Sequence, residues 1–197
     1  MKNKMVLKGI EAYINQLFLE RYPRSFHFYN GKHTKKLVEE VLYLMEKSML
    51  SPEEQFSLQI AAWFFDIAQL EFWLDEQHNT KGLAELIATA GVEKPLIDGI
   101  VDLLPPNYPA QDPLSLSEQL LSDAIRFYWS RNSYDFWVEA LRQDTQIMEG
   151  RTISHEEWLE HLAMFMQSWI FRPILHHPFR GIVHQSFRAK VHQFLLR

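Results

Sequence analysis

The chain has 197 residues and a formal net charge of -5, which argues against a general nucleic-acid-binding protein. A hydrophobic content of 47% excludes general disorder, and the lack of cysteine excludes disulfides, thiolate metal sites and thiol catalysis. No uninterrupted apolar stretch reaches the length of a signal peptide or a membrane span, so we expect a cytoplasmic protein without a membrane partner.

Apolar residues recur at helical spacing along most of the chain, while strand-like alternation is scarce. Together with the small number of glycines and prolines, this pattern predicts an all-α protein of about seven to ten helices. We see no internal repeat and no domain boundary, so residues 1–197 are expected to form a single domain. Helices are predicted at about residues 7–20, 32–50, from 52 onward, 79–90, 95–104, from 115 or 117 onward, 133–148, 155–171 and 182–196.

Three serines give helix-start signals. Ser51 precedes a proline at the first helical position, Ser115 or Ser117 precedes the helix that carries Asp123, and Ser154 opens a capping box. Four prolines between positions 105 and 113 predict a loop, because proline cannot sustain a hydrogen-bonded helix.

One carboxylate, Asp66, stands in the middle of the apolar helical run Ala61–Ala68. An ionised side chain among Trp63, Phe64 and Ile67 carries a large desolvation cost unless a cation, a hydrogen-bond donor or a metal satisfies it. We therefore expect a partner for Asp66 elsewhere in the chain.

Three fragments, Asn30-Gly31-Lys32-His33-Thr34, Ala61-Ala62-Trp63-Phe64-Phe65-Asp66-Ile67 and Ser122-Asp123-Ala124, occur in this order. Their order and spacing resemble the HD-domain superfamily of metal-dependent phosphohydrolases, and the likeness covers most of the chain. The resemblance implies an HD-like helical bundle acting on a nucleotide or another phosphoester. In that site His33, Asp66, Asp123 and the residue at position 65 would hold a divalent cation that polarises a phosphoryl oxygen and activates water, with Asp66 in the catalytic position.

The chain departs from this family pattern at one ligand position. Phe65 occupies the place of the second histidine and has no atom that can bind a metal. Tyr29 stands where a histidine often precedes the asparagine, and Gln77-His78-Asn79-Thr80 stands where a carboxylate-bearing motif is expected. The remaining ligands would favour Mg²⁺ or Mn²⁺. We therefore expect weakened or lost metal binding and little hydrolase activity, the alternative being a non-catalytic HD-fold binding or regulatory module.

Each candidate ligand also has an ordinary structural interpretation. His33 could be a helix-start histidine with a backbone partner, Asp66 could accept from a backbone amide or an arginine, and Asp123 could pair with Arg126 on the surface.

The last predicted helix carries His184, Arg188 and His192 at a spacing of four residues, which places them on one face. This face is either a clamp for an anion or phosphate, an acidic partner's docking surface, or a solvated surface that balances the acidic remainder of the chain. The many aromatic residues favour a core, and some could instead line a pocket or the seam of a homo-oligomer.

Overall fold

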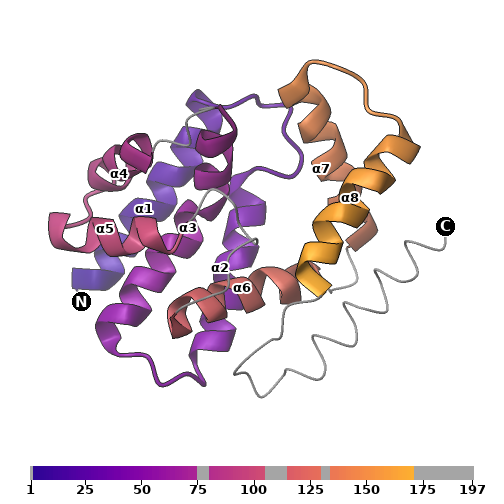
Figure 1. The fold of residues 1–197 in the computed structure, drawn as a ribbon. Coiled ribbons are helices and arrows are strands. Elements are labelled where there is room, and N and C mark those ends of the chain that lie inside the picture. Colours follow the sequence, from indigo (N-terminus) through magenta and orange to yellow (C-terminus); the bar gives the residue numbers. More distant parts are fainter. Residues whose placement is uncertain (1, 75–79, 105–114, 130–133, 171–197) are drawn as a thin grey trace.

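The computed structural model describes residues 2–74, 80–104, 115–129 and 134–170 (Figure 1). Across these residues the chain forms eight α-helices and no strand, which confirms the predicted all-α class and the expected seven to ten helices. The helices are α1 (Lys2–Glu20), α2 (Gly31–Met45), α3 (Pro52–Leu74), α4 (Thr80–Thr89), α5 (Lys94–Asp102), α6 (Leu116–Trp129), α7 (Tyr134–Glu149) and α8 (His155–Ile170).

The three predicted serine caps are confirmed. The hydroxyl oxygens of Ser51, Ser115 and Ser154 each accept from the backbone N–H three residues later, at 3.3, 3.2 and 3.1 Å. Ser115, and not Ser117, is therefore the residue that starts α6. The proline-rich segment at 105–113 and the predicted helix at 182–196 lie outside the described residues.

Two predicted helix boundaries are wrong. Helix α1 begins at Lys2, five residues before the predicted start, and α2 ends at Met45 and not at Leu50. Both the backbone N–H and the hydroxyl of Ser48 donate to the Met45 carbonyl, forming a tight turn that ends the helix. Leu50 is buried in the connection beyond that turn, so an apolar residue outside the helix extends the helical pattern.

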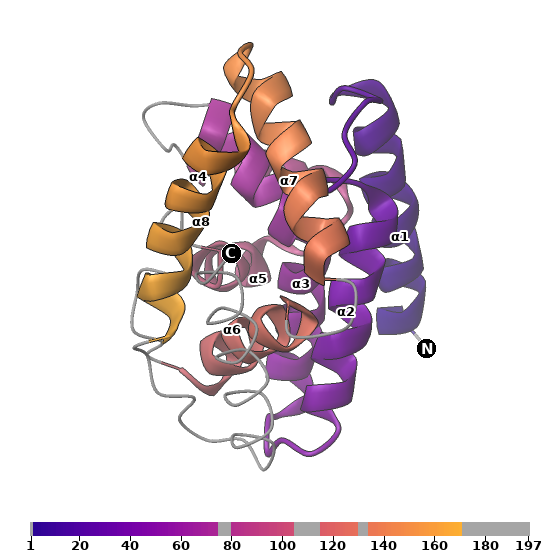
Figure 2. The same cartoon turned by 90° about the vertical axis from the view of Figure 1, so that its right-hand side faces the viewer.

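Helix α3 lies at the centre of the bundle and contacts α1, α2, α4, α5 and α6. In Figure 1, α4 and α5 lie on one side of the molecule and α7 and α8 on the other, and Figure 2 shows α7 in front of α2 and α3. Because neighbours surround α3, its residues 60–68 are buried on every face. This arrangement carries Asp66 into the middle of the core, with 0% of its surface exposed.

The buried apolar side chains of α1 to α8 form one hydrophobic cluster. None of the helices within the described ranges is both long enough and apolar enough to cross a membrane.

Candidate functional site

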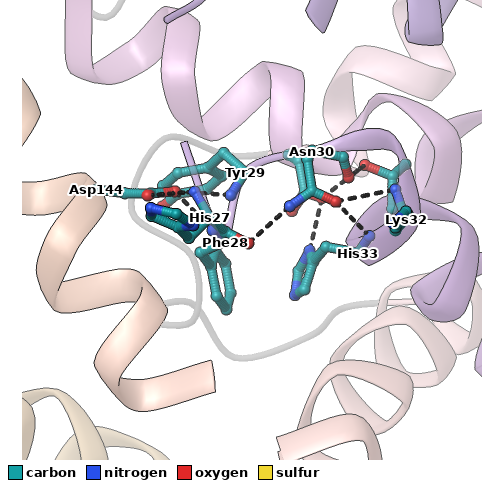
Figure 3. A network of polar contacts seen from close by, with 9 residues as sticks. His27, Phe28, Tyr29, Asn30, Lys32, His33 and Asp144 are labelled. Atoms are coloured by element: carbon teal, nitrogen blue, oxygen red, sulfur yellow. Dashed lines mark hydrogen bonds and ion pairs between the residues drawn. The ribbon is translucent and has the colours of Figure 1, made fainter. Parts of the chain in front are cut away.

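The first turn of α2 is fixed by Asn30, whose backbone is extended and whose side chain caps the helix. Its Oδ1 accepts from the backbone N–H groups of Lys32 and His33 at 3.0 and 3.1 Å, as Figure 3 shows. Glycine suits position 31 because a Cβ there would clash with Oδ1 of Asn15 on α1. The cap and this close approach set where the His33 side chain leaves the helix.

His33 and Asp66 meet in the interior. His33 Nδ1 lies 2.7 Å from Asp66 Oδ2, and the Thr34 hydroxyl donates to the same oxygen at 2.6 Å. Asp66 is completely buried and His33 is 3% exposed, so both groups interact away from bulk water. The partner that the sequence required for Asp66 is therefore a pair of side chains from the first turn of α2.

Aromatic rings enclose the His33 imidazole. The ring centroids of Phe28, Tyr128 and Trp137 lie 3.9, 4.9 and 5.3 Å from that of His33. These rings come from the α1–α2 loop, α6 and α7, so three parts of the bundle meet at His33. Lys36 places its ammonium 5.7 Å from the centre of the Trp137 ring, which is a favourable cation–π distance.

Four buried polar atoms in this region have no hydrogen-bond partner within the part of the chain that the structure describes. They are His33 Nε2, Asp66 Oδ1, the Tyr128 hydroxyl and Trp137 Nε1. Burial raises the pKa of Tyr128 well above its usual range, and the negative charges of Asp66 and Glu40 raise it further. Tyr128 therefore keeps its proton and is a neutral donor close to the Asp66 carboxylate.

A second buried carboxylate, Asp144 on α7, holds the loop that precedes α2. Its Oδ1 accepts from the backbone N–H of His27 at 2.6 Å, and its Oδ2 accepts from those of Phe28 and Tyr29 at 2.8 Å each, as Figure 3 shows. Asp144 is 0% exposed. Burial raises its pKa, and the three N–H groups oppose that rise by stabilising the ionised form.

The structure brings two of the three predicted metal ligands, His33 and Asp66, into direct contact. Asp123 is 6% exposed on α6, so this carboxylate is buried and not on the surface, and its pairing with Arg126 stays a prediction. Throughout the described ranges, no group of three or more His, Asp or Glu side chains is arranged to hold a metal ion. A site made by all three residues stays a prediction.

The side chains present fall short of the metal centre that the HD resemblance implies. Phe65, in the place of a histidine ligand, is 9% exposed and belongs to the hydrophobic cluster. One oxygen of Asp66 already faces two hydrogen-bonding groups, from His33 and Thr34. Within the described part of the chain, the pair therefore keeps one carboxylate oxygen and one imidazole nitrogen without a hydrogen-bond partner, which is fewer metal-binding atoms than a catalytic metal normally receives from a protein.

The remaining predicted positions are not described by the structure. His184, Arg188 and His192 lie outside the described residues, as do Gln77-His78-Asn79. A groove of about 490 Å³ lies at the N-terminal end of α3, and its wall includes Val6, Phe56 and Val92. None of the predicted site residues lines this groove.

The sequence interpretation missed Asp144. A signal for Asp144 exists, because Trp137, Leu141, Asp144 and Met148 share one helical face and all except Asp144 are apolar. An aspartate in such a stripe requires buried donors, as Asp66 does.

Comparisons of the chain with protein-family models, with curated proteins and with solved structures found no match.

Proposed function

We propose that the chain is an HD-like domain in which a hydrogen-bonded His33–Asp66 pair has replaced the catalytic metal centre, so that phosphohydrolase activity is weak or lost. The observation that carries this proposal is the 2.7 Å contact between His33 Nδ1 and Asp66 Oδ2, next to a phenylalanine at position 65. The HD resemblance of the sequence supplies the expected activity, and the contact supplies the reason for its loss.

In this proposal, hydrogen-bond donors of the chain stabilise the Asp66 carboxylate in place of a metal cation. A carboxylate that binds a metal gives its lone pairs to the cation, and a ligating imidazole must offer an unprotonated nitrogen. Here an ionised Asp66 requires a proton on His33 Nδ1, and Thr34 adds a second donor to the same oxygen. These donors satisfy the buried carboxylate from within the chain.

A second candidate function is a non-catalytic binding or regulatory module. It is favoured by buried polar atoms that have no hydrogen-bond partner among the described residues. These are His33 Nε2 and Asp66 Oδ1 of the pair itself, and the Tyr128 hydroxyl and Trp137 Nε1 next to it. A small polar molecule that supplies both a donor and an acceptor would satisfy such atoms, and each buried polar atom left unsatisfied costs about 1–3 kcal/mol. A nucleotide or phosphoester ligand, a homo-oligomer and a cytoplasmic location stay predictions from the sequence.

The test compares metal binding and hydrolysis in matched variants. Five proteins are purified and titrated with Mn²⁺ by calorimetry: wild type, Asp66→Asn, Phe65→His, Phe65→His with Asp66→Asn, and Phe56→His as a control on the same helix. Each protein is also assayed against a generic phosphodiester and a nucleotide panel with Mn²⁺ present. We expect negligible binding and turnover for wild type and for the Phe56 control, a gain of Mn²⁺ binding for Phe65→His, and loss of that gain when Asp66 is replaced.

The proposal is contradicted if wild type hydrolyses a substrate in a Mn²⁺-dependent manner and Asp66→Asn abolishes the activity. In that case the three residues predicted from sequence form a working metal site. Hydrolysis that persists in every variant would also contradict it, because the activity would then reside elsewhere in the chain.

A further inference from the structure

Asp144 is connected to His33 through a continuous series of contacts in the α1–α2 loop. Asp144 accepts three consecutive backbone N–H groups, from His27 to Tyr29. The middle residue of these three, Phe28, places its ring 3.9 Å from the imidazole of His33. The carboxylate of α7 therefore fixes the backbone that carries the aromatic cover of His33.

A second connection runs through the helix cap. The Asn30 side-chain amide donates to the His27 carbonyl at 2.7 Å, while its oxygen caps the His33 backbone N–H at 3.1 Å. His27 thus bonds Asp144 through its N–H and Asn30 through its carbonyl, as Figure 3 shows. Displacing the loop would disturb both the ring above His33 and the cap that starts its helix.

Tyr29 in the same loop is affected by the negative charges of both Asp66 and Asp144. Burial raises the pKa of Tyr29 well above its usual range, and the negative charges of Asp66 and Asp144 raise it further. Both carboxylates therefore lie within electrostatic reach of this one side chain.

We propose that Asp144 is the positioning residue of the His33–Asp66 pair: by holding the backbone of His27–Tyr29, it keeps Phe28 over the imidazole and His33 against Asp66. In this proposal Asp144 acts through the backbone of the loop. This inference concerns the same pair as the proposed function, but it is measured by the state of His33 without added metal, so the two proposals fail independently.

The experiment measures how accessible His33 is to a chemical reagent. Wild type, Asp144→Asn and Ile87→Ala are treated with diethyl pyrocarbonate in the presence of chelator, and modification of His33 is followed by mass spectrometry. Ile87 is fully buried in α4, so its truncation lowers stability without touching the loop. We expect His33 to react at least about tenfold faster in Asp144→Asn than in wild type, and at the wild-type rate in Ile87→Ala.

A spectroscopic readout accompanies the reaction. In wild type, the His33 Nδ1 proton bonded to Asp66 is expected to give a downfield proton resonance protected from exchange with water. We expect Asp144→Asn to lose that resonance and Ile87→Ala to keep it. A folded Asp144→Asn protein with an unchanged resonance and an unchanged reaction rate overturns the proposal. An equal increase in rate for Ile87→Ala also overturns it, since general destabilisation would then explain the effect.

A measurement on wild type covers the case in which Asp144→Asn does not fold. The backbone N–H groups of His27, Phe28 and Tyr29 belong to a loop, yet a buried carboxylate holds all three. We expect them to exchange with deuterium at least about a hundredfold more slowly than the exposed loop residue Arg24. Exchange at the rate of Arg24 would overturn the proposal.

Discussion

The hydrogen bond from Thr34 to Asp66 gives a direct test of how the buried carboxylate is stabilised. Thr34→Val removes the hydroxyl and keeps nearly the same shape, while Asp66 stays fully buried and keeps its contact with His33. A hydrogen bond to a charged group contributes about 1.5–3 kcal/mol, so we expect the free energy of unfolding to fall by about 2 kcal/mol. For a chain of this size that loss corresponds to a thermal midpoint about 4–8 °C lower.

The control for this substitution is Thr89→Val. The Thr89 hydroxyl also donates at 2.8 Å, but its acceptor is the exposed Glu85 carbonyl one turn earlier in α4. We expect this control to change stability by no more than about 0.5 kcal/mol. Urea unfolding followed by circular dichroism measures both variants under the same conditions.

A double-mutant cycle tests whether the charge of Asp66 causes the loss of stability in Thr34→Val. In an Asp66→Asn background the acceptor is neutral, so Thr34→Val should cost only about 0.5–1.5 kcal/mol. A Thr34→Val cost below about 0.5 kcal/mol in the wild-type background, or an equal cost in both backgrounds, would refute the reasoning that Thr34 stabilises an ionised Asp66.

Three further predictions concern the ends of helices and the second buried acid. Gly31→Ala should cost less than about 1 kcal/mol in thermal unfolding because the exposed Asn15 side chain can rotate away, and in an Asn15→Ala background it should stabilise the protein by about 0.5–1 kcal/mol. Ser51→Ala should cost about 1 kcal/mol in urea unfolding through loss of the α3 cap. The raised pKa of Asp144 means that the stability contributed by its titration is fully present below its ordinary pKa of about 4 and is lost as the pH rises through the folded-state pKa. The difference in urea midpoint between wild type and Asp144→Asn should therefore narrow as the pH rises above about 4, and a widening difference would contradict this sign.

The side-chain chemistry of the chain predicts the starts of α3, α6 and α8, whereas a helix end can lack a side-chain signal. Ser51, Ser115 and Ser154 each supply a side-chain acceptor for the first turn, so the start of a helix is encoded within four residues. The end of α2 has no such signal: the Ser48 turn stops the helix, and the buried Leu50 beyond it imitates another inward-facing helical position. Tertiary burial of a loop residue cannot be separated from helix periodicity in a single sequence.

The sequence predicts that Asp66 requires a buried partner, but it does not predict which atoms contact Asp66. Burial of Asp66 within an apolar run implies a partner, and His33, which the HD resemblance names as a candidate ligand, lies against Asp66 in the structure. Which atoms meet depends on how α2 packs against α3, and residues 33 and 66 are too far apart in sequence for spacing to specify it. In the sequence, Thr34 is recognised only as part of the fragment Asn30–Thr34. Its hydrogen bond to Asp66 depends on the same packing of α2 against α3.

The two buried acids divide one short segment between them. Asp144 takes the backbone N–H groups of residues 27–29, whereas Asp66 faces hydrogen-bonding side chains at 33 and 34, with Asn30 capping the helix in between. Since Asp144 belongs to α7 and Asp66 to α3, residues 27–34 are held by two different helices. His33 would therefore be correctly oriented beside a histidine introduced at position 65 only while Asp66 and Asp144 keep these hydrogen bonds. The metal binding expected for Phe65→His should then disappear when Asp144→Asn is added, because a ligand must be oriented as well as present.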